Sequence, residues 1–286
     1  MEVIFFALIA YFGWGVGDVF GTIASRKIGG YSTTFWYLVF AFILFSLFSP
    51  FFIDSLKNLT IGLFLINILL GCVGSIGLVA FYEGVRKGNA ALVSTITGSA
   101  AVVAVILGVV FFQEDLSIQQ IVAIAIIMVG LILSTLELKK IQSRTGRYLS
   151  ILLGFVAMFS WGIYQAFIKI PVGEIGWFWA GIFALSSFPL ILLFMRMRAE
   201  KLNTPLSKGS FLPLILNVIL LGGGTFSFYR ALELGQIAVV TPIANSYPTI
   251  FVILAFILFK DPITKQQMAG IITTLLGIVL LSIVSV

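Results

Sequence analysis

The feature that most constrains the fold is a series of apolar stretches, each about 20 residues long and separated by short polar connections. A helix of this length crosses the hydrocarbon core of a bilayer, which is about 30 Å thick. Charged residues make up only 10% of the chain, too few to cover a soluble surface. We therefore expect an all-α, multi-pass integral membrane protein. Its ten predicted transmembrane helices cover residues 3–25, 31–52, 60–82, 89–112, 117–137, 148–170, 175–195, 210–230, 236–259 and 266–285.

The chain also matches itself without gaps. Trp14-Gly15 is repeated 147 positions later as Trp161-Gly162, and Phe81-Tyr82 recurs in the same way as Phe228-Tyr229. Shared hydrophobicity does not explain repeated polar and aromatic positions. The match divides a single membrane domain into two five-helix repeats, residues 1–138 and 148–286. Because five is odd, the second repeat must enter the membrane in the opposite direction, which predicts inverted repeats with a binding site near the midplane.

Further motifs mark equivalent places in the two repeats. Gly88 and Gly235 stand at the entries of the fourth and ninth helices. An acid follows the end of each helix, in Phe112-Gln113-Glu114 and in Phe259-Lys260-Asp261. Together with the Trp-Gly pairs, they make the whole chain similar to the drug/metabolite transporter superfamily in its ten-helix EamA-type form. The family usually has glycine before that acid, so Gln113 and Lys260 depart from the pattern. The ninth helix keeps the family-like Pro248, where the fourth has Ala101.

Asp18 is the strongest candidate for a functional side chain. It lies within the first predicted helix, and a carboxylate at membrane depth is costly unless it faces a cavity or a partner. The segment Asp18-Val19-Phe20-Gly21-Thr22 resembles the acidic motif of the small multidrug resistance branch, which implies that Asp18 couples protons to transport. Its repeat mate is Gln165, so only one such acid is expected. The alternative is structural, with Asp18 reaching the interface or pairing with a base such as Lys27.

The fourth and ninth helices are the predicted cavity walls. Pro242 and Pro248 each remove a backbone donor, which is tolerated where cavity water or polar side chains replace the bond, so we expect hinges or kinks there. The alternative is a kinked packing helix whose hydroxyls bond to their own backbone. Polar-tipped aromatics complete the set, with packing or interfacial roles as their alternative. The predicted cavity residues are Trp14, Asp18, Tyr82, Thr97, Ser99, Trp161, Gln165, Tyr229, Asn245 and Tyr247.

No catalytic or metal site is expected. The chain has no histidine and one cysteine, Cys72, and it lacks a Walker sequence. The prediction is therefore not an enzyme, with no cofactor. Basic residues gather beside helix ends rather than forming a nucleic-acid patch. The expected partners are a small-molecule substrate, the lipid bilayer and protons, and the expected state is a monomer or a weak homodimer. Glu114 and Asp261 are expected to cap helix ends, and Glu83 with Arg86 and Arg230 with Glu233 to form local ion pairs.

Orientation follows from positive charge. The loops after the odd-numbered helices hold most of the Lys and Arg residues, and the other side holds Lys57, Lys169 and Arg230. The positive-inside rule then places those loops in the cytoplasm and both termini outside. The expected location is a cell (inner) membrane. Many relatives are thought to keep both termini inside, so the family and the charge count disagree.

These features lead to a functional hypothesis with two rivals. A neutral-polar, aromatic-lined cavity with one acid suits a zwitterion or an organic cation better than a polyanion. The resemblance implies a secondary active exporter of small polar or amphipathic metabolites, such as amino acids, that works by alternating access. A first alternative is a proton-coupled antiporter of organic cations or drugs. An alternative of another class is a non-transport membrane protein, scramblase-like or structural.

Overall fold

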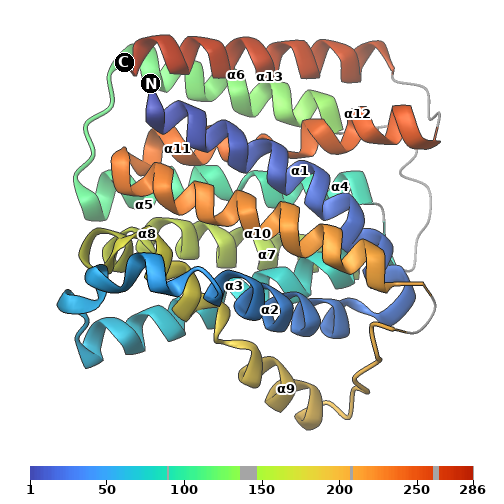
Figure 1. The fold of residues 1–286 in the computed structure, drawn as a ribbon. Coiled ribbons are helices and arrows are strands. Elements are labelled where there is room, and N and C mark those ends of the chain that lie inside the picture. The colour runs from blue at the N-terminus through green and yellow to red at the C-terminus, as the bar shows by residue number, and fades with distance from the viewer. Residues whose placement is uncertain (89, 136–146, 207–208, 260–263, 286) are drawn as a thin grey trace.

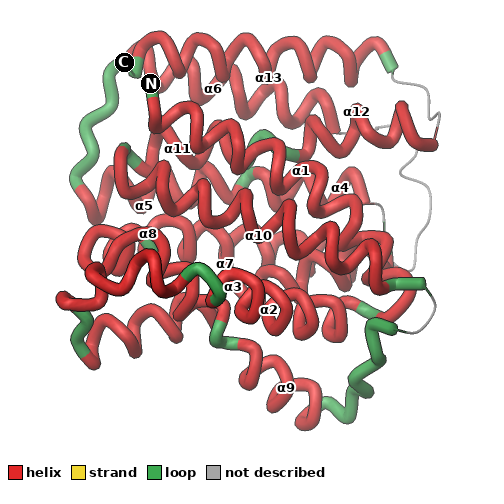
Figure 2. Tube along the Cα trace, viewed as in Figure 1, coloured by secondary structure: helices red, strands yellow, loops and turns green. Residues whose placement is uncertain are grey.

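A computed structural model describes residues 1–88, 90–135, 147–206, 209–259 and 264–285, and all regular elements in these ranges are helical (Figures 1 and 2). The elements are α1 (Glu2–Ile28), α2 (Gly30–Ser46), η1 (Ser49–Asn58), α3 (Ile61–Lys87), α4 (Ala90–Gly98), α5 (Ala100–Phe112), α6 (Ile118–Thr135), α7 (Arg147–Phe167), α8 (Lys169–Leu185), α9 (Phe188–Met197), α10 (Phe211–Leu234), α11 (Ile237–Ala244), α12 (Pro248–Phe259) and α13 (Lys265–Val284).

These elements correspond to the ten predicted spans. Within the described ranges, eight helical stretches are long and apolar enough to cross a membrane, the bent pair α2 and η1 adds a ninth, and α6 is a shorter apolar helix. Three spans are each divided between two elements: α4 with α5, α8 with α9, and α11 with α12. The all-helical membrane fold predicted from the sequence is confirmed.

Two predicted spans have different bounds in the structure. The second was expected over residues 31–52, but α2 ends at Ser46 and the chain then bends by 93° into η1, a 3-10 helix. The seventh was expected to begin at residue 175, but the corner before it is Gly176, with φ 80° and ψ 158°. Gly29, its repeat mate, forms the same corner in the first repeat, with φ 89° and ψ 153°. Only glycine adopts this backbone region readily, so both corners depend on their glycines.

The first helix of each repeat packs on the third helix of the other. On α1 and α10, Gly13 lies beside Gly224 and Gly17 lies beside Leu221. Residue numbers rise along α1 as they fall along α10, so the two helices are antiparallel. The contacts of α3 with α7 repeat this arrangement, with Gly74 beside Tyr164 and Gly77 beside Trp161.

The remaining contacts show the same inverted relation. Helices α6 and α13 lie side by side along one edge of the bundle (Figure 1), with Gly130 against Thr274 and Gly270 against Ser134. The broken spans also cross, since α4 packs on α12 and α5 packs on α11. The two repeats therefore run in opposite directions, as the odd helix count predicted. They are related by a pseudo-twofold axis, and the first helix of each packs against the other repeat.

Small residues allow the central helices to approach closely. A Cβ atom on Gly13 would lie 2.7 Å from the Leu220 carbonyl oxygen, and one on Gly17 would lie 2.6 Å from the Leu221 nitrogen. Such contacts are the small-residue packing common in membrane helices. Gly21 has a different neighbour, because its Cα faces the phenol of Tyr82. The glycine stripe of α1 thus joins a packing interface to the site described next.

Candidate functional site: a central cavity

A cavity lies between the two repeats, with about 100 Å³ of space open to the centres of water-sized molecules. Six of the predicted site residues line it: Trp14, Asp18, Trp161, Gln165, Tyr229 and Tyr247. The rest of the wall consists of Tyr37, Leu38, Gly71, Gly74, Ser75, Leu78, Tyr164, Ala184, Leu185, Leu221, Thr225 and Phe228. Asp18 is the one charged side chain among these residues, so a largely aromatic and apolar wall carries a single carboxyl group.

Asp18 is held in a network of neutral groups. It is 1% exposed, and its Oδ1 accepts a hydrogen bond from the Tyr82 hydroxyl at 3.3 Å. The same hydroxyl accepts from the Asn217 amide at 3.0 Å, and that amide also donates to the Gly17 carbonyl at 2.9 Å. Tyr82 therefore supports Asp18 from behind rather than lining the cavity. A Cβ atom on Gly21 would collide with the Tyr82 hydroxyl, so this arrangement requires glycine.

Asp18 does not pair with Lys27, which was a structural alternative considered for it. Lys27 instead donates to the Gly209 carbonyl at 3.0 Å, and no ion pair involves Asp18 anywhere in the described ranges. The side chain is also 1% exposed, so it is enclosed by protein and does not extend to the surface of the bundle. A buried carboxyl group at a cavity wall without a basic partner is the arrangement typical of functional sites in membranes.

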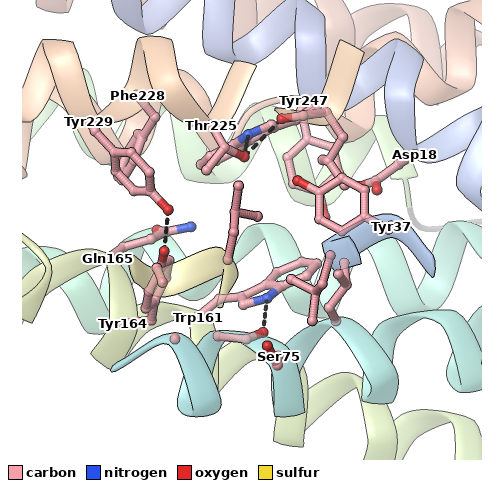
Figure 3. A pocket seen from close by; sticks show the side chains of 18 residues that line it. Asp18, Tyr37, Ser75, Trp161, Tyr164, Gln165, Thr225, Phe228, Tyr229 and Tyr247 are labelled. Atoms are coloured by element: carbon pink, nitrogen blue, oxygen red, sulfur yellow. Dashed lines mark hydrogen bonds between the residues drawn. The ribbon is translucent and has the colours of Figure 1, made fainter. Parts of the chain in front are cut away.

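The second repeat places an amide where the first places the acid. Gln165 and Asn245 bond reciprocally, with the Asn245 amide donating to Gln165 Oε1 at 2.7 Å and the Gln165 amide donating to Asn245 Oδ1 at 3.3 Å. Beside this pair, the hydroxyls of Tyr164 and Tyr229 are in direct contact. Figure 3 shows the tyrosine pair on one side of the cavity and Asp18 on the other. The two ends of the cavity therefore differ in chemistry.

The two repeat-related tryptophans line the centre of the cavity. Trp14 Nε1 donates to Thr225 Oγ1 at 3.0 Å, and Trp161 Nε1 donates to the Gly74 carbonyl at 3.2 Å. Both indoles are thus held in position by hydrogen bonds across the interface between the repeats. Their central location differs from that of tryptophans in interfacial belts.

Of the polar residues predicted on the fourth and ninth helices, Tyr247 lines the cavity, and Thr97, Ser99 and Asn245 lie outside the lining. Thr97 Oγ1 lies 3.1 Å from the Tyr247 hydroxyl and so supports a cavity residue, as Asn245 supports Gln165. Ser99 donates to the Thr95 carbonyl of its own helix at 3.2 Å, which is the structural alternative stated above. Both hydroxyls sit beside helix breaks.

The two prolines differ in their relation to the break in the ninth span. Pro248 begins α12, and the three residues before it separate α12 from α11. A proline suits the first turn of a helix because it has no N–H to leave unpaired. Pro242 lies inside α11, so the observed break coincides with Pro248. The fourth span breaks at the equivalent place, Ser99, where Ala101 stands instead of proline.

Sequence reasoning missed the second helix altogether. Tyr37 and Leu38 bring α2 into the wall, and Ser75, whose hydroxyl lies 2.8 Å from that of Ser187, brings in α3. Thr225, the partner of Trp14, was also missed. Tyr37 carried one available signal, because it is a polar-tipped aromatic residue in the middle of an apolar span, as Trp14 is.

One end of the bundle, here called the basic end, is where α1 ends and α2 begins, and carries Arg26, Lys27, Arg86 and Lys87. Glu83 organises this end. It accepts from the Gly30 amide at 2.9 Å and pairs with Arg86 at 2.7 Å and Lys87 at 3.1 Å. The ion pair of Glu83 and Arg86 expected from their spacing is confirmed.

The opposite end, here called the aromatic end, contains the Tyr164–Tyr229 contact and is packed with rings. Phe226 stacks near Phe45 with centroids 4.4 Å apart, and Phe52 of η1 stacks on Phe178 at 4.3 Å. Trp179 fixes η1 by donating to the Phe52 carbonyl at 2.7 Å. The predicted Arg230–Glu233 ion pair also lies at this end. The cavity is therefore bounded by aromatic packing on this side.

Glu114 caps a helix, as expected. Its two carboxylate oxygens accept from the amides of Ile237 at 2.7 Å and Ala238 at 2.9 Å, which are the first residues of α11. Lys169 adds an ion pair at 3.1 Å and also donates to the Gly235 carbonyl at 2.7 Å. The equivalent prediction for Asp261 falls outside the described residues.

Comparisons with known proteins agree with this geometry. The sequence profile of the EamA-like transporter family matches residues 1–136 and, separately, residues 148–283. An uncharacterized protein of Methanocaldococcus jannaschii is 36% identical over 69 residues, which cover 24% of this chain and 50% of that protein. The chain thus aligns with only half of that relative. A crystal structure of a protein with 10% sequence identity superposes with a TM-score of 0.80 over 99% of this chain and 97% of the other, which shows a shared fold.

Proposed function

Because the chain belongs to the EamA-like transporter family, and is therefore a multi-pass membrane transporter of small molecules, we propose that it is a secondary active exporter of small amphipathic amines. Amino acids and related compounds are the substrate class that the cavity suits best. The single observation that carries this proposal is the lining, in which Asp18 is the one charged group in a wall of indoles, phenols and aliphatic side chains.

The cavity offers a distinct place to each part of such a substrate. The carboxylate of Asp18 would receive an ammonium group, since no basic side chain competes for it among the lining residues. Trp14, Tyr37 and Tyr247 add aromatic faces, which attract cations by roughly 0.5–2 kcal/mol each. The hydroxyl of Ser75, which can accept from Ser187, would donate to a substrate carboxylate. Leu78, Leu185 and Leu221 would contact its hydrocarbon part.

Alternating access supplies the transport step of the proposal. Inverted repeats let a bundle exchange an opening at one end for an opening at the other by rocking one part against the other. The helix exchange of α1 with α10 and of α3 with α7 would carry this movement, and the breaks near Ser99 and Pro248 would absorb it. The observed aromatic packing at one end corresponds to closure on that side.

Flux into proteoliposomes tests the proposal. The panel should hold zwitterionic amino acids, organic monocations and a dianion, each with and without an imposed pH gradient. We expect saturable flux of zwitterions that responds to the gradient and falls at least tenfold in Asp18→Asn. Asp115→Asn, an exposed acid outside the cavity, is the matched control. Saturable flux that ignores both the gradient and Asp18→Asn would refute coupling at Asp18, and lipid movement without solute flux would indicate the scramblase-like alternative.

A second candidate is a proton-coupled antiporter of organic cations. The absence of a basic partner for Asp18 within the described ranges favours it, since a carboxylate without an ion-pair partner can bind a proton or a cation in turn. Transport of cations that lack a carboxylate, with zwitterions excluded, would decide for this candidate.

We also propose that the basic end faces the cytoplasm, with both termini outside, as the positive-inside rule predicts. Arg26, Lys27, Arg86 and Lys87 support this orientation, against Lys57, Lys169 and Arg230 at the other end. Labelling of a terminal tag in intact cells is the test. A tag reached only after permeabilisation would reverse the orientation.

A further inference from the structure

Several buried polar side chains have no hydrogen-bond partner. Among the described residues these are Thr22, Thr34, Asn67, Ser94 and Asn217, all at most 3% exposed. For Asn217 the unpaired atom is Oδ1, since its amide nitrogen is already bonded. An unpaired buried polar group costs about 1–3 kcal/mol, and lipid offers nothing to bond with it. Clustering of such groups therefore calls for an explanation.

Three of these groups lie one helical turn beyond a cavity residue, all toward the same end. Thr22 follows Asp18 by four positions on α1, which ends at the basic end. Thr34 precedes Leu38 by four positions on α2, and Asn217 precedes Leu221 by four on α10, and both of these helices begin at the basic end. Residues four apart on a helix share a face. The three unpaired oxygens therefore continue the cavity wall from Asp18 toward the basic end.

The aromatic end lacks this series. The repeat mates of Thr22, Thr34 and Asn217 are Lys169, Gly181 and Leu70. Lys169 is paired with Glu114, Gly181 makes room for the ring of Phe226, and Leu70 is apolar. In the described part of the chain, Asn67 is the one unpaired group on that side, a turn beyond Gly71 on α3. One buried water can satisfy a lone amide, whereas unpaired groups on three helices call for several waters.

We infer that a hydrated polar path runs from Asp18 past Thr22, Thr34 and Asn217 to the basic end, and that the Asp18 carboxyl exchanges protons with the aqueous phase there. The path rests on the proposed function, since it names the side that supplies the coupling proton. Waters bonded to the unpaired oxygens would relay the proton while the substrate cavity remains closed. Tyr82 and Asn217 hold the carboxyl at the inner mouth of the path, and Glu83 with Arg86 and Lys87 frames the outer mouth.

Few titratable groups compete with Asp18 along this path. The side chains that face it from the helices packed around α1 are the phenols of Tyr37 on α2, Tyr82 on α3 and Tyr247 ahead of α12. The ionisable residues of α10, Tyr229, Arg230 and Glu233, lie near its end at the aromatic end, away from the path, and α11 has no ionisable residue. Asp18 is therefore the proton acceptor at the inner end of the path.

Cysteine accessibility tests the path without requiring transport. In a Cys72→Ser background, Thr22→Cys and Thr34→Cys would be exposed to a small, cationic, membrane-impermeant methanethiosulfonate added at the basic end. The controls are Thr33→Cys, whose native hydroxyl is buried but bonded to the Gly29 carbonyl at 2.9 Å, and Leu70→Cys at the aromatic end. We expect both path positions to react at least tenfold faster than both controls. Equal rates, or reaction only from the opposite side, would overturn the path.

Transport measurements then test the role of the hydroxyls. We expect Thr22→Val and Thr34→Val to slow gradient-driven flux at least fivefold and to enlarge its solvent deuterium isotope effect, while the Ser variants restore both. Thr33→Val should leave flux unchanged. If the Val variants raise thermal stability and leave flux intact, the oxygens are dry and the inference fails. Labelling without flux would instead refute the proposed function alone, and flux without labelling would refute the path alone.

Discussion

The cap formed by Glu114 gives a quantitative test of how the two repeats are joined. This residue ends the fourth span of the first repeat, yet its carboxylate accepts both of the first amides of α11, in the second repeat. Ile237 and Ala238 are fully buried, so neither amide can form a hydrogen bond with solvent if the carboxylate is removed. The perturbation is Glu114→Ala, with Glu114→Gln as an intermediate.

The expected loss follows from the two amides. Each buried donor left without an acceptor costs about 1–3 kcal/mol, so Glu114→Ala should destabilise the fold by about 2–6 kcal/mol. Lys169 adds little, because it is partly exposed and keeps the Gly235 carbonyl as a partner. In Glu114→Gln one oxygen still accepts, so a loss of about 1–3 kcal/mol is expected.

Reversible unfolding in mixed detergent micelles measures this loss. Asp115→Ala is the matched control, since the neighbouring acid is exposed, and surface changes of this kind usually stay within about 0.5 kcal/mol. If the free energy of unfolding of Glu114→Ala lies within about 1 kcal/mol of that of Asp115→Ala, the carboxylate is not the hydrogen-bond acceptor that the amides of α11 need. The account of the cap would then be wrong.

Three further changes test other parts of the structure. Gln113 has φ 52°, a left-handed conformation that is strained for any residue but glycine. Gln113→Gly should therefore stabilise the fold by about 0.5–1 kcal/mol in the same assay, and a loss of stability would show that Gln113 is not strained. Gly21→Ala should displace Tyr82 from Asp18 and reduce flux, as Tyr82→Phe should, while Gly223→Ala, where an added Cβ meets open space, should not. Tyr229→Phe removes the hydroxyl contact with Tyr164. If that hydrogen bond is worth about 1 kcal/mol, its loss should make labelling of Leu70→Cys at the aromatic end roughly fivefold faster. An unchanged labelling rate would refute a role of the contact in closing this end.

The sequence predicted the architecture because the repeat carried it. A gap-free match at one offset, with an odd number of helices in each copy, implies inverted halves, and the antiparallel contacts of Gly13 with Gly224 and of Gly74 with Tyr164 agree. Asp18 and Glu114 were found because an acid beside or within an apolar span is costly and therefore stands out. These predictions rested on patterns that membrane burial makes unambiguous.

Other parts could not be predicted for a physical reason. A helix that is apolar all round gives no sign of which face lines a cavity, and so Tyr37 and Ser75 were missed. α2 ends at Ser46, four residues before Pro50, and the fourth span breaks at Ser99, directly after Gly98. Glycine and proline are common in membrane helices, so neither residue by itself predicts a break. Packing between the repeats decides these positions, and only a three-dimensional arrangement reveals it.

The exchange of first helices has a consequence for biogenesis. Since α1 packs on α10 and α7 packs on α3, each half buries its glycine-lined faces only against the other. The first half made alone would present Gly13 and Gly17 of α1 and Gly74 and Gly77 of α3 to lipid. The second half alone would present Gly224 of α10. Neither half therefore completes its packing until both halves have been inserted in opposite orientations. Two genes that each encode one half should rebuild the protein together, and either gene alone should yield a product that quality-control proteases remove.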